Sequence, residues 1–115
     1  MANKHRGELD VKLLGKSWTM RLTFEAIADI EAKTAMGLAA VVRRFIQSEF
    51  GVNEVAAVIW AGIDAAHDDA PDLEAVKRAV VEEGFGGLAV TAAEFLGRAV
   101  AAGEQPAKAA KAAKR

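Results

Sequence analysis

The chain has 115 residues, a formal net charge of -1 at pH 7 and no cysteine. This length fits a single domain, and the near-neutral balance gives no overall attraction to nucleic acid or to an anionic membrane. The lack of cysteine excludes a disulfide framework and thiolate chemistry. The opening residues contain no apolar stretch typical of a signal peptide, and no apolar run is long enough to predict a membrane span.

Two alternating runs near the start predict a β-hairpin over residues 8–23. Apolar side chains occupy every second position in both: Leu9, Val11 and Leu13, then Trp18, Met20 and Leu22. This period of two is typical of half-buried strands. Gly15 lies between the runs and supplies the positive φ that a tight hairpin turn requires. We expect the helix that begins at Phe24 to cover the apolar face, and residues 1–6 to form a flexible arm.

The period changes from 2 to about 3.6 at the end of the hairpin, which predicts helices from there onward. The hydroxyl of Thr23 is placed to cap the first helix, which we expect to end near Gly37. A second helix is predicted over residues 38–49, where apolar residues recur at helical spacing. Asn53 is expected to cap a third helix, whose many apolar residues predict that it is the most buried.

Glycine and proline divide the remainder of the chain. Asp72 is the expected cap of a fourth helix, which stops at a glycine-rich break over residues 84–87. A fifth helix is expected to end at Gly103. Residues 106–115 repeat alanine and lysine, a composition that predicts a disordered basic tail. The sequence therefore predicts an α+β fold with one domain over residues 1–105, in which an N-terminal β-hairpin packs on a bundle of four to five short helices.

No arrangement of residues predicts catalysis, so we expect no enzyme activity, no cofactor and no bound metal. The acidic loop at His67, Asp68 and Asp69 resembles a metal site in composition, but it lacks the spacing of a calcium loop. We interpret it as the solvated end of a helix. The glycines of residues 84–87 follow no strand, as a dinucleotide site would require, and are interpreted as a break between helices.

The hairpin offers the first candidates for contact with a partner protein. A sheet of only two strands has free edges, and another chain can add a strand to such an edge. Lys12 and Thr19 lie on the two strands and are therefore candidate contact residues.

Four residues of the helical region are further candidates for partner contacts. Trp60 lies beside the apolar stripe of its helix, and tryptophan is enriched at interfaces. Phe50 belongs to a set of aromatic residues that cannot all be assigned to one small core, and any that are exposed would be candidate contacts. Arg43 and Arg44 lie on the outer face of the second helix, where a solvated pair of charges is the alternative interpretation.

Three stretches of the chain follow an order that resembles one known family. They are a basic start at residues 3–8, a short hairpin with Gly15 at its turn, and residues 21–24 leading into residues 26–31. The family consists of tail proteins of phages and gene transfer agents, described either as tail tube proteins or as tail assembly chaperones. The resemblance covers roughly residues 3–100, and it implies a non-enzymatic role in tail morphogenesis.

The resemblance and the basic tail together leave three functions open. The first is a tail assembly chaperone that binds tape-measure and tail-tube proteins in the bacterial cytoplasm while particles are assembled. The alternative is a structural tail component, a tube or joining subunit that self-associates and remains in the particle. A third is a small DNA-associated protein, because the lysines of residues 106–115 could bind phosphate weakly. No membrane partner is expected.

Overall fold

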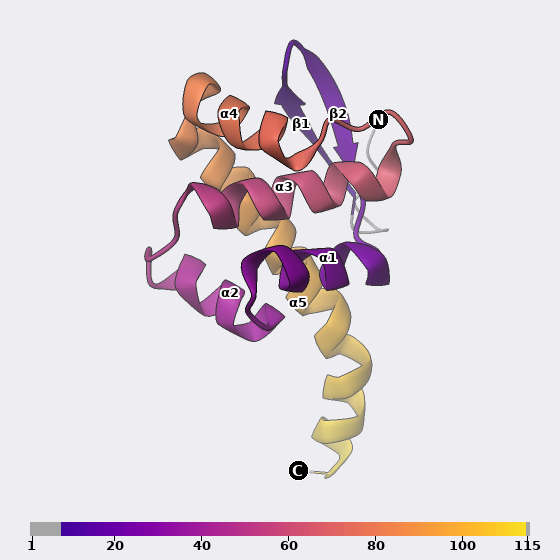
Figure 1. Cartoon of the computed structure of the whole chain (residues 1–115). Coiled ribbons are helices and arrows are strands. Elements are labelled where there is room, and N and C mark those ends of the chain that lie inside the picture. Colours follow the sequence, from indigo (N-terminus) through magenta and orange to yellow (C-terminus); the bar gives the residue numbers. More distant parts are fainter. Residues whose placement is uncertain (1–7, 115) are drawn as a thin grey trace.

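The computed structural model describes the backbone of residues 8–114 and the side chains of residues 8–101. Two strands are followed by five helices: β1 (Leu9–Leu13), β2 (Lys16–Met20), α1 (Phe24–Thr34), α2 (Leu38–Ile46), α3 (Val52–Ala66), α4 (Leu73–Glu83) and α5 (Phe85–Lys114). Figure 1 shows α3 crossing the middle of the body, with the hairpin standing against one side of it and α1 and α2 on the other. The predicted α+β fold is confirmed. The predicted flexible arm of residues 1–6 lies outside the described residues.

The hairpin turns on two residues with positive φ, Leu14 at 54° and Gly15 at 80°. Such primed turns match the twist of antiparallel strands. The register runs from Leu13 opposite Lys16 to Leu9 opposite Met20. All three apolar side chains of β1 are buried, as predicted.

The main cover of the hairpin is α3, so the expectation that the helix beginning at Phe24 provides it is wrong. β2 packs along α3, whereas β1 is contacted by α4 and α5. α1 packs on the opposite side of α3. Phe24 itself is 81% exposed. β2 can approach α3 closely because Gly62 has no side chain, and the backbone N–H of Arg21 donates to the Gly62 carbonyl at 2.9 Å. α3 is thus the most buried helix, as predicted.

Two predicted helix caps are confirmed. The hydroxyl of Thr23 accepts a hydrogen bond from the Ala26 N–H at 3.0 Å and begins α1. The carboxylate of Asp72 accepts from the Ala75 N–H at 2.8 Å and begins α4. Both bonds satisfy backbone donors that the first turn of a helix leaves without an intrahelical partner.

Two other predicted helix ends are wrong. α1 stops at Thr34, and Ala35 takes the left-handed conformation with φ 57°, so Gly37 instead precedes α2 as its N-cap. α3 begins after Gly51 rather than after Asn53. The carboxylate of Glu54 explains this start, because it accepts a hydrogen bond from the Gly51 N–H at 2.7 Å and so fixes Gly51 at the cap position.

The glycine-rich break is shorter than predicted, and the last helix is longer. Only Gly84, with φ 131°, separates α4 from α5, and Phe85 already belongs to α5. The predicted end at Gly103 is wrong, because the backbone of α5 continues to Lys114. Alanine and lysine have high helix propensity, which favours this continuation. The side chains of the tail lie outside the described part of the structure, and the predicted disorder of residues 106–115 stays a prediction.

The close approach at Gly62 predicts opposite effects for two glycine-to-alanine substitutions. A Cβ at position 62 would lie 2.8 Å from the Cβ and 2.9 Å from the Cε of Met20. Overpacking of this kind costs about 1–3 kcal/mol, more than the ~1 kcal/mol that alanine gains over glycine in a helix. We expect Gly62→Ala to lower the free energy of unfolding, measured by urea denaturation.

Gly97→Ala is the matched control for this substitution. Gly97 lies on α5, and no atom outside its own helical turn lies within 4 Å of the position that an alanine methyl group would take. This variant should raise the free energy of unfolding by up to ~1 kcal/mol. Equal stabilisation by both substitutions would show that β2 does not depend on the close contact.

Candidate functional site

One edge of the hairpin is contacted, at the end away from the turn, by α3 and by the loop that follows α3. The backbone N–H of Thr19, on the outer edge of β2, donates to Nε2 of His67 at 3.0 Å. This bond requires Nε2 to be the unprotonated ring nitrogen. The ring of His67 also meets Trp18 edge-on, with centroids 5.1 Å apart. Together with the bond from Arg21 to Gly62, these contacts occupy the edge of β2 at Thr19 and just beyond Met20, whereas Ser17 near the turn is exposed.

The edge of β1 is open. The residues that flank a two-residue turn form a hydrogen-bonded pair, and such pairs alternate along an antiparallel ladder. Given the pairing of Leu13 with Lys16, the backbone N–H and C=O groups of Asp10 and Lys12 point away from β2. Within the described part of the chain, no hydrogen bond reaches these outward groups.

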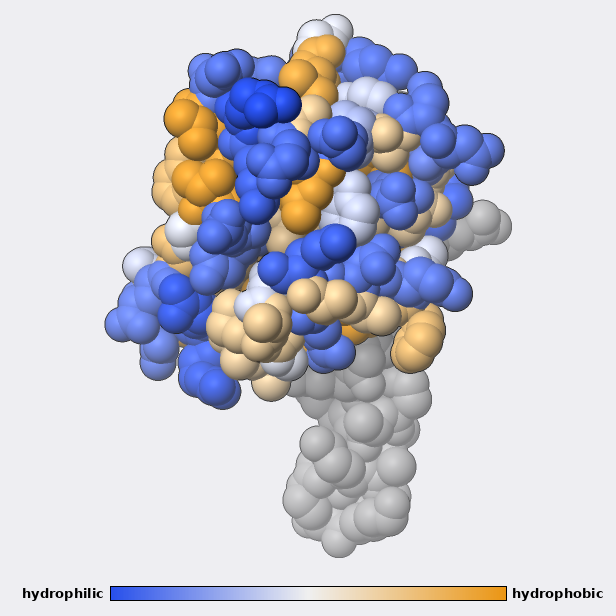
Figure 2. Space-filling view, viewed as in Figure 1, coloured by the Kyte–Doolittle hydropathy of each residue, from blue (hydrophilic) through white to orange (hydrophobic). Residues whose placement is uncertain are grey.

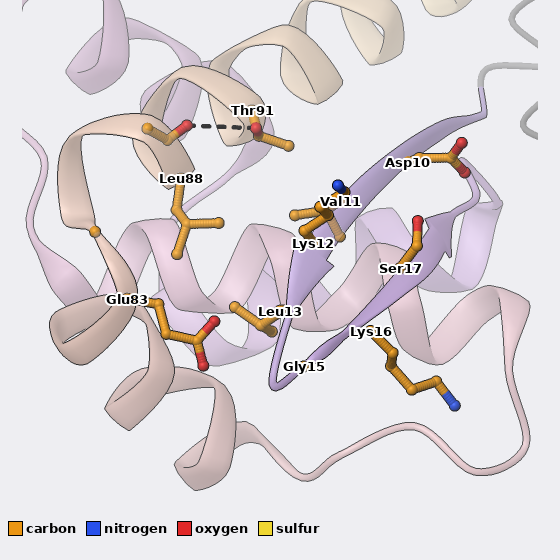
Figure 3. A pocket seen from close by; sticks show the side chains of 12 residues that line it. Asp10, Val11, Lys12, Leu13, Gly15, Lys16, Ser17, Glu83, Leu88 and Thr91 are labelled. Carbon is orange, nitrogen blue, oxygen red and sulfur yellow. Dashed lines mark hydrogen bonds between the residues drawn. The ribbon is translucent and has the colours of Figure 1, made fainter.

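A groove of about 750 Å³ runs beside this open edge. The hairpin forms one wall, with residues of β1, of the turn and of the first half of β2, and the junction of α4 and α5 forms the other (Figure 3). The far wall includes Gly84 and Gly87, which have no side chains to fill the space. At the end near the turn, the Leu14 N–H donates to both carboxylate oxygens of Glu83 at 3.1 Å, which joins the two walls.

The two candidate residues of the hairpin therefore differ. Lys12 is exposed and lines the groove. Thr19 is half-buried, and its N–H already has a partner in His67. No feature of the sequence pattern distinguished the two edges, because His67, which accepts from Thr19, lies 48 positions after it in the chain.

Phe50 belongs to a stack of three aromatic rings. Its ring lies 4.5 Å from that of Phe45 and 5.7 Å from that of Phe85, measured between centroids. All three residues are half-buried and pack against the core. The stack joins α2 to the beginning of α5, so Phe50 has a structural contact, and its role in partner binding stays a prediction.

The other three candidates lie apart from the groove. Trp60 is half-buried, and the ammonium group of Lys33 lies 5.5 Å from its ring centroid. Arg44 forms an ion pair with Glu54, with Nε 3.2 Å from Oε2. Arg43 is exposed. These positions do not converge on one site, and their contacts with a partner stay predictions.

A second, smaller hollow lies between α2 and α5. It measures about 350 Å³ and is lined by apolar or small residues: Val42, Phe45, Ile46, Ala93, Leu96, Gly97 and Val100. Ile46 is 77% exposed there. Figure 2 shows, on the face it presents, further hydrophobic areas at the hairpin tip and over α4, within a largely hydrophilic surface. Leu14 and Val81 are exposed large apolar residues of those two elements.

Neither a metal cluster nor a membrane-spanning helix is found in the described residues. Among them, no group of three or more His, Asp or Glu side chains could hold a metal ion. No helix in the same part of the chain has the length and apolar character to cross a membrane. The loop that resembled a metal site in composition instead directs His67 to β2.

Comparison with known proteins identifies a family. A family model described as "Phage tail tube protein, GTA-gp10" matches residues 6–113. The match spans the hairpin and all five helices, and it confirms the resemblance to tail proteins of phages and gene transfer agents. No curated protein and no solved structure matches the chain.

The contact between His67 and β2 can be tested by substitution. His67→Phe keeps an aromatic ring beside Trp18 but removes the acceptor for the Thr19 N–H. We expect the free energy of unfolding to fall by about 0.5–1.5 kcal/mol, because a partly buried donor loses its partner. Chemical denaturation measures this change.

Asp68→Ala is the control in the same loop. Asp68 is exposed, and substitutions at such positions usually change stability by no more than about 0.5 kcal/mol. If the two variants had the same stability, the hydrogen bond from Thr19 to His67 would contribute nothing measurable.

Proposed function

The chain belongs to the phage tail tube protein, GTA-gp10 family, and we propose on this basis that it is a structural subunit of the tail of a phage-like particle. In this proposal it remains in the particle, contacts other tail proteins and associates with copies of itself. The observation that carries the proposal is the family match, which covers residues 6–113 and so includes all but the last residue of the described elements.

Features of the structure support a role based on contacts with other proteins. The edge of β1 offers free backbone donors and acceptors beside a groove, and such edges accept strands from other chains. Large apolar side chains, including Phe24 and Ile46, are exposed at other places on the surface. A subunit that is packed between neighbours can bury such groups.

The tail assembly chaperone remains the second candidate. The family description favours the structural role, since it names a tube protein. The same exposed apolar side chains, however, could also bind helices of a tape-measure protein for a short time during assembly. The two functions differ in one respect that can be measured, namely whether the protein stays in the finished particle.

We expect quantitative mass spectrometry of purified, tailed particles to detect this protein in many copies per particle. A tube is built from repeated subunits, so its copy number should be comparable to that of other repeated tail proteins and constant between preparations. Electron microscopy of a strain lacking the gene should show particles without complete tails.

The other outcomes of these measurements identify the competing functions. A protein that is absent from particles but needed for tails would be an assembly chaperone. Normal tails in the deletion strain would contradict both tail functions and would favour the DNA-associated alternative. The control is the same strain carrying an intact copy of the gene, which should restore the tails.

A further inference from the structure

We propose that Phe24 of one copy inserts into the hollow between α2 and α5 of a neighbouring copy, and that this contact joins the copies head to tail. This inference rests on the proposed function, because it names the contact by which structural subunits would associate. Three observations carry it: an exposed aromatic ring, an apolar hollow large enough for such a ring, and opposite charges beside the ring and the hollow.

Phe24 is a large apolar side chain that the described fold leaves uncovered. It is the first residue of α1, and it is 81% exposed, whereas the other four phenylalanines of the chain are buried or half-buried. An enclosed aromatic side chain buries about 150–250 Å² of surface, so the free energy of burying this ring is available to a contact with another protein. Ala28, one helical turn further along α1, is exposed and too small to hold a neighbour away from the ring.

The α2–α5 hollow has the size and the chemistry to hold a phenylalanine ring. It measures about 350 Å³, and all of the residues that line it are apolar or glycine. A dry cavity of about 150 Å³ lined by apolar side chains is sufficient to bind benzene. Phe45 lies in its wall and can meet an inserted ring edge-on or offset. The inserted segment would also cover Ile46, which is 77% exposed.

The ring that fills the hollow belongs to another copy. The hollow is lined by residues of α2 and α5 alone, and Phe24 of the same copy is not among them. Figure 1 shows α1 beginning on the right, below the end of β2, whereas α2 lies at the lower left. The backbone of α5 continues past the hollow as one helix to Lys114, so it does not fold back over its own preceding turns.

Charged residues beside the ring and the hollow are complementary. Glu25 follows Phe24 directly and is exposed. Arg43 adjoins Val42 in the wall of the hollow, lies one turn before Ile46 and is exposed. Among the described residues, neither of these two charged side chains has an ion-pair partner. Opposite charges at the rim of an interface guide association and disfavour wrong orientations. Insertion of Phe24 therefore brings Glu25 to the side of the hollow where Arg43 lies.

A contact of this kind is directional. Each copy gives its ring to one neighbour and receives a ring from another, so the contact is heterologous. Repeated heterologous contacts generate closed rings or open chains of subunits, depending on the rotation between neighbours. The inference thus adds a specific connection between subunits to the proposed structural function.

Truncation of the ring in the full-length chain is the first test. By sedimentation velocity, we expect Phe24→Ala to weaken self-association at least tenfold, because a central aromatic anchor is lost. Val81→Ala is the matched control, since Val81 is also a large apolar residue, 63% exposed, but lies on α4. It should change self-association less than about threefold. Circular dichroism should show equal helix content in both variants, because both side chains are exposed.

Filling the hollow is the second test. Gly97→Leu places a side chain where the ring would enter, and Gly86→Leu makes the same change at the start of α5, outside the hollow. At both positions, no atom outside the local helical turn lies within 4 Å of an added Cβ, so both variants should keep the fold. We expect Gly97→Leu to weaken self-association at least tenfold and Gly86→Leu to leave it within about threefold.

Mixing the two defective variants tests the direction of the contact. Phe24→Ala keeps an intact hollow, and Gly97→Leu keeps an intact ring. Each variant alone should sediment as a monomer, whereas an equimolar mixture should form a one-to-one dimer that does not grow further. Charge reversal gives an independent check: Glu25→Arg or Arg43→Glu alone should weaken self-association a few-fold, and the double variant should recover it because the attractive pair is re-formed.

Several outcomes would overturn the inference. These are equal behaviour of Phe24→Ala and Val81→Ala, equal behaviour of the two leucine variants, a mixture that stays monomeric, and no recovery in the double charge variant. A wild-type chain that stays monomeric at high concentration would also overturn it, and would leave the hollow to a different protein or to another segment of the same chain.

The two proposals can fail independently. If mass spectrometry finds many copies in particles while Phe24→Ala and Val81→Ala associate equally, the structural function stands and Phe24 is not the connection. If particles lack the protein but the mixed variants form the one-to-one dimer, the contact still joins copies and the structural function is wrong.

Discussion

The close contact between β2 and α3 is the constraint on which the other contacts depend. A hairpin of two strands is only marginally stable by itself, so its apolar face must pack against other elements. Gly62 allows Met20 to lie directly against α3, and the Arg21 N–H is bound to the Gly62 carbonyl. Both contacts lie at one point of α3. They fix the position along α3 at which the end of β2 packs against this helix.

This position of the hairpin makes its two edges unequal. Because β2 lies alongside α3, its outer edge meets the C-terminal end of that helix. There His67 accepts a hydrogen bond from the backbone N–H of Thr19. β1 lies on the other side, beside the junction of α4 and α5, and Gly84 and Gly87 leave a groove there. A free sheet edge invites uncontrolled pairing unless it is covered or limited. Here the edge of β2 is covered at Thr19, and the edge of β1 lies beside a groove.

Local patterns predicted the elements of this fold well. The alternating residues of the hairpin, the positive φ at Gly15 and the caps at Thr23 and Asp72 each depend on interactions within a few residues, which a sequence displays directly. The misplaced boundaries have a similar local cause. Gly51 and Asn53 are both acceptable caps, and the side chain of Glu54 decides between them through a bond that sequence spacing alone did not single out.

The candidate site could be predicted only in part, because it depends on distant residues. The sequence indicated free hairpin edges, but it could not show that His67 closes one of them or that Glu83 joins the turn to α4, 69 positions away. It also suggested that the first helix covers the hairpin, since adjacent elements often pack together. The structure separates them, because α3 has the glycine that allows a strand to approach. Tertiary contacts of this kind make two edges that look equivalent in the sequence unequal in the structure.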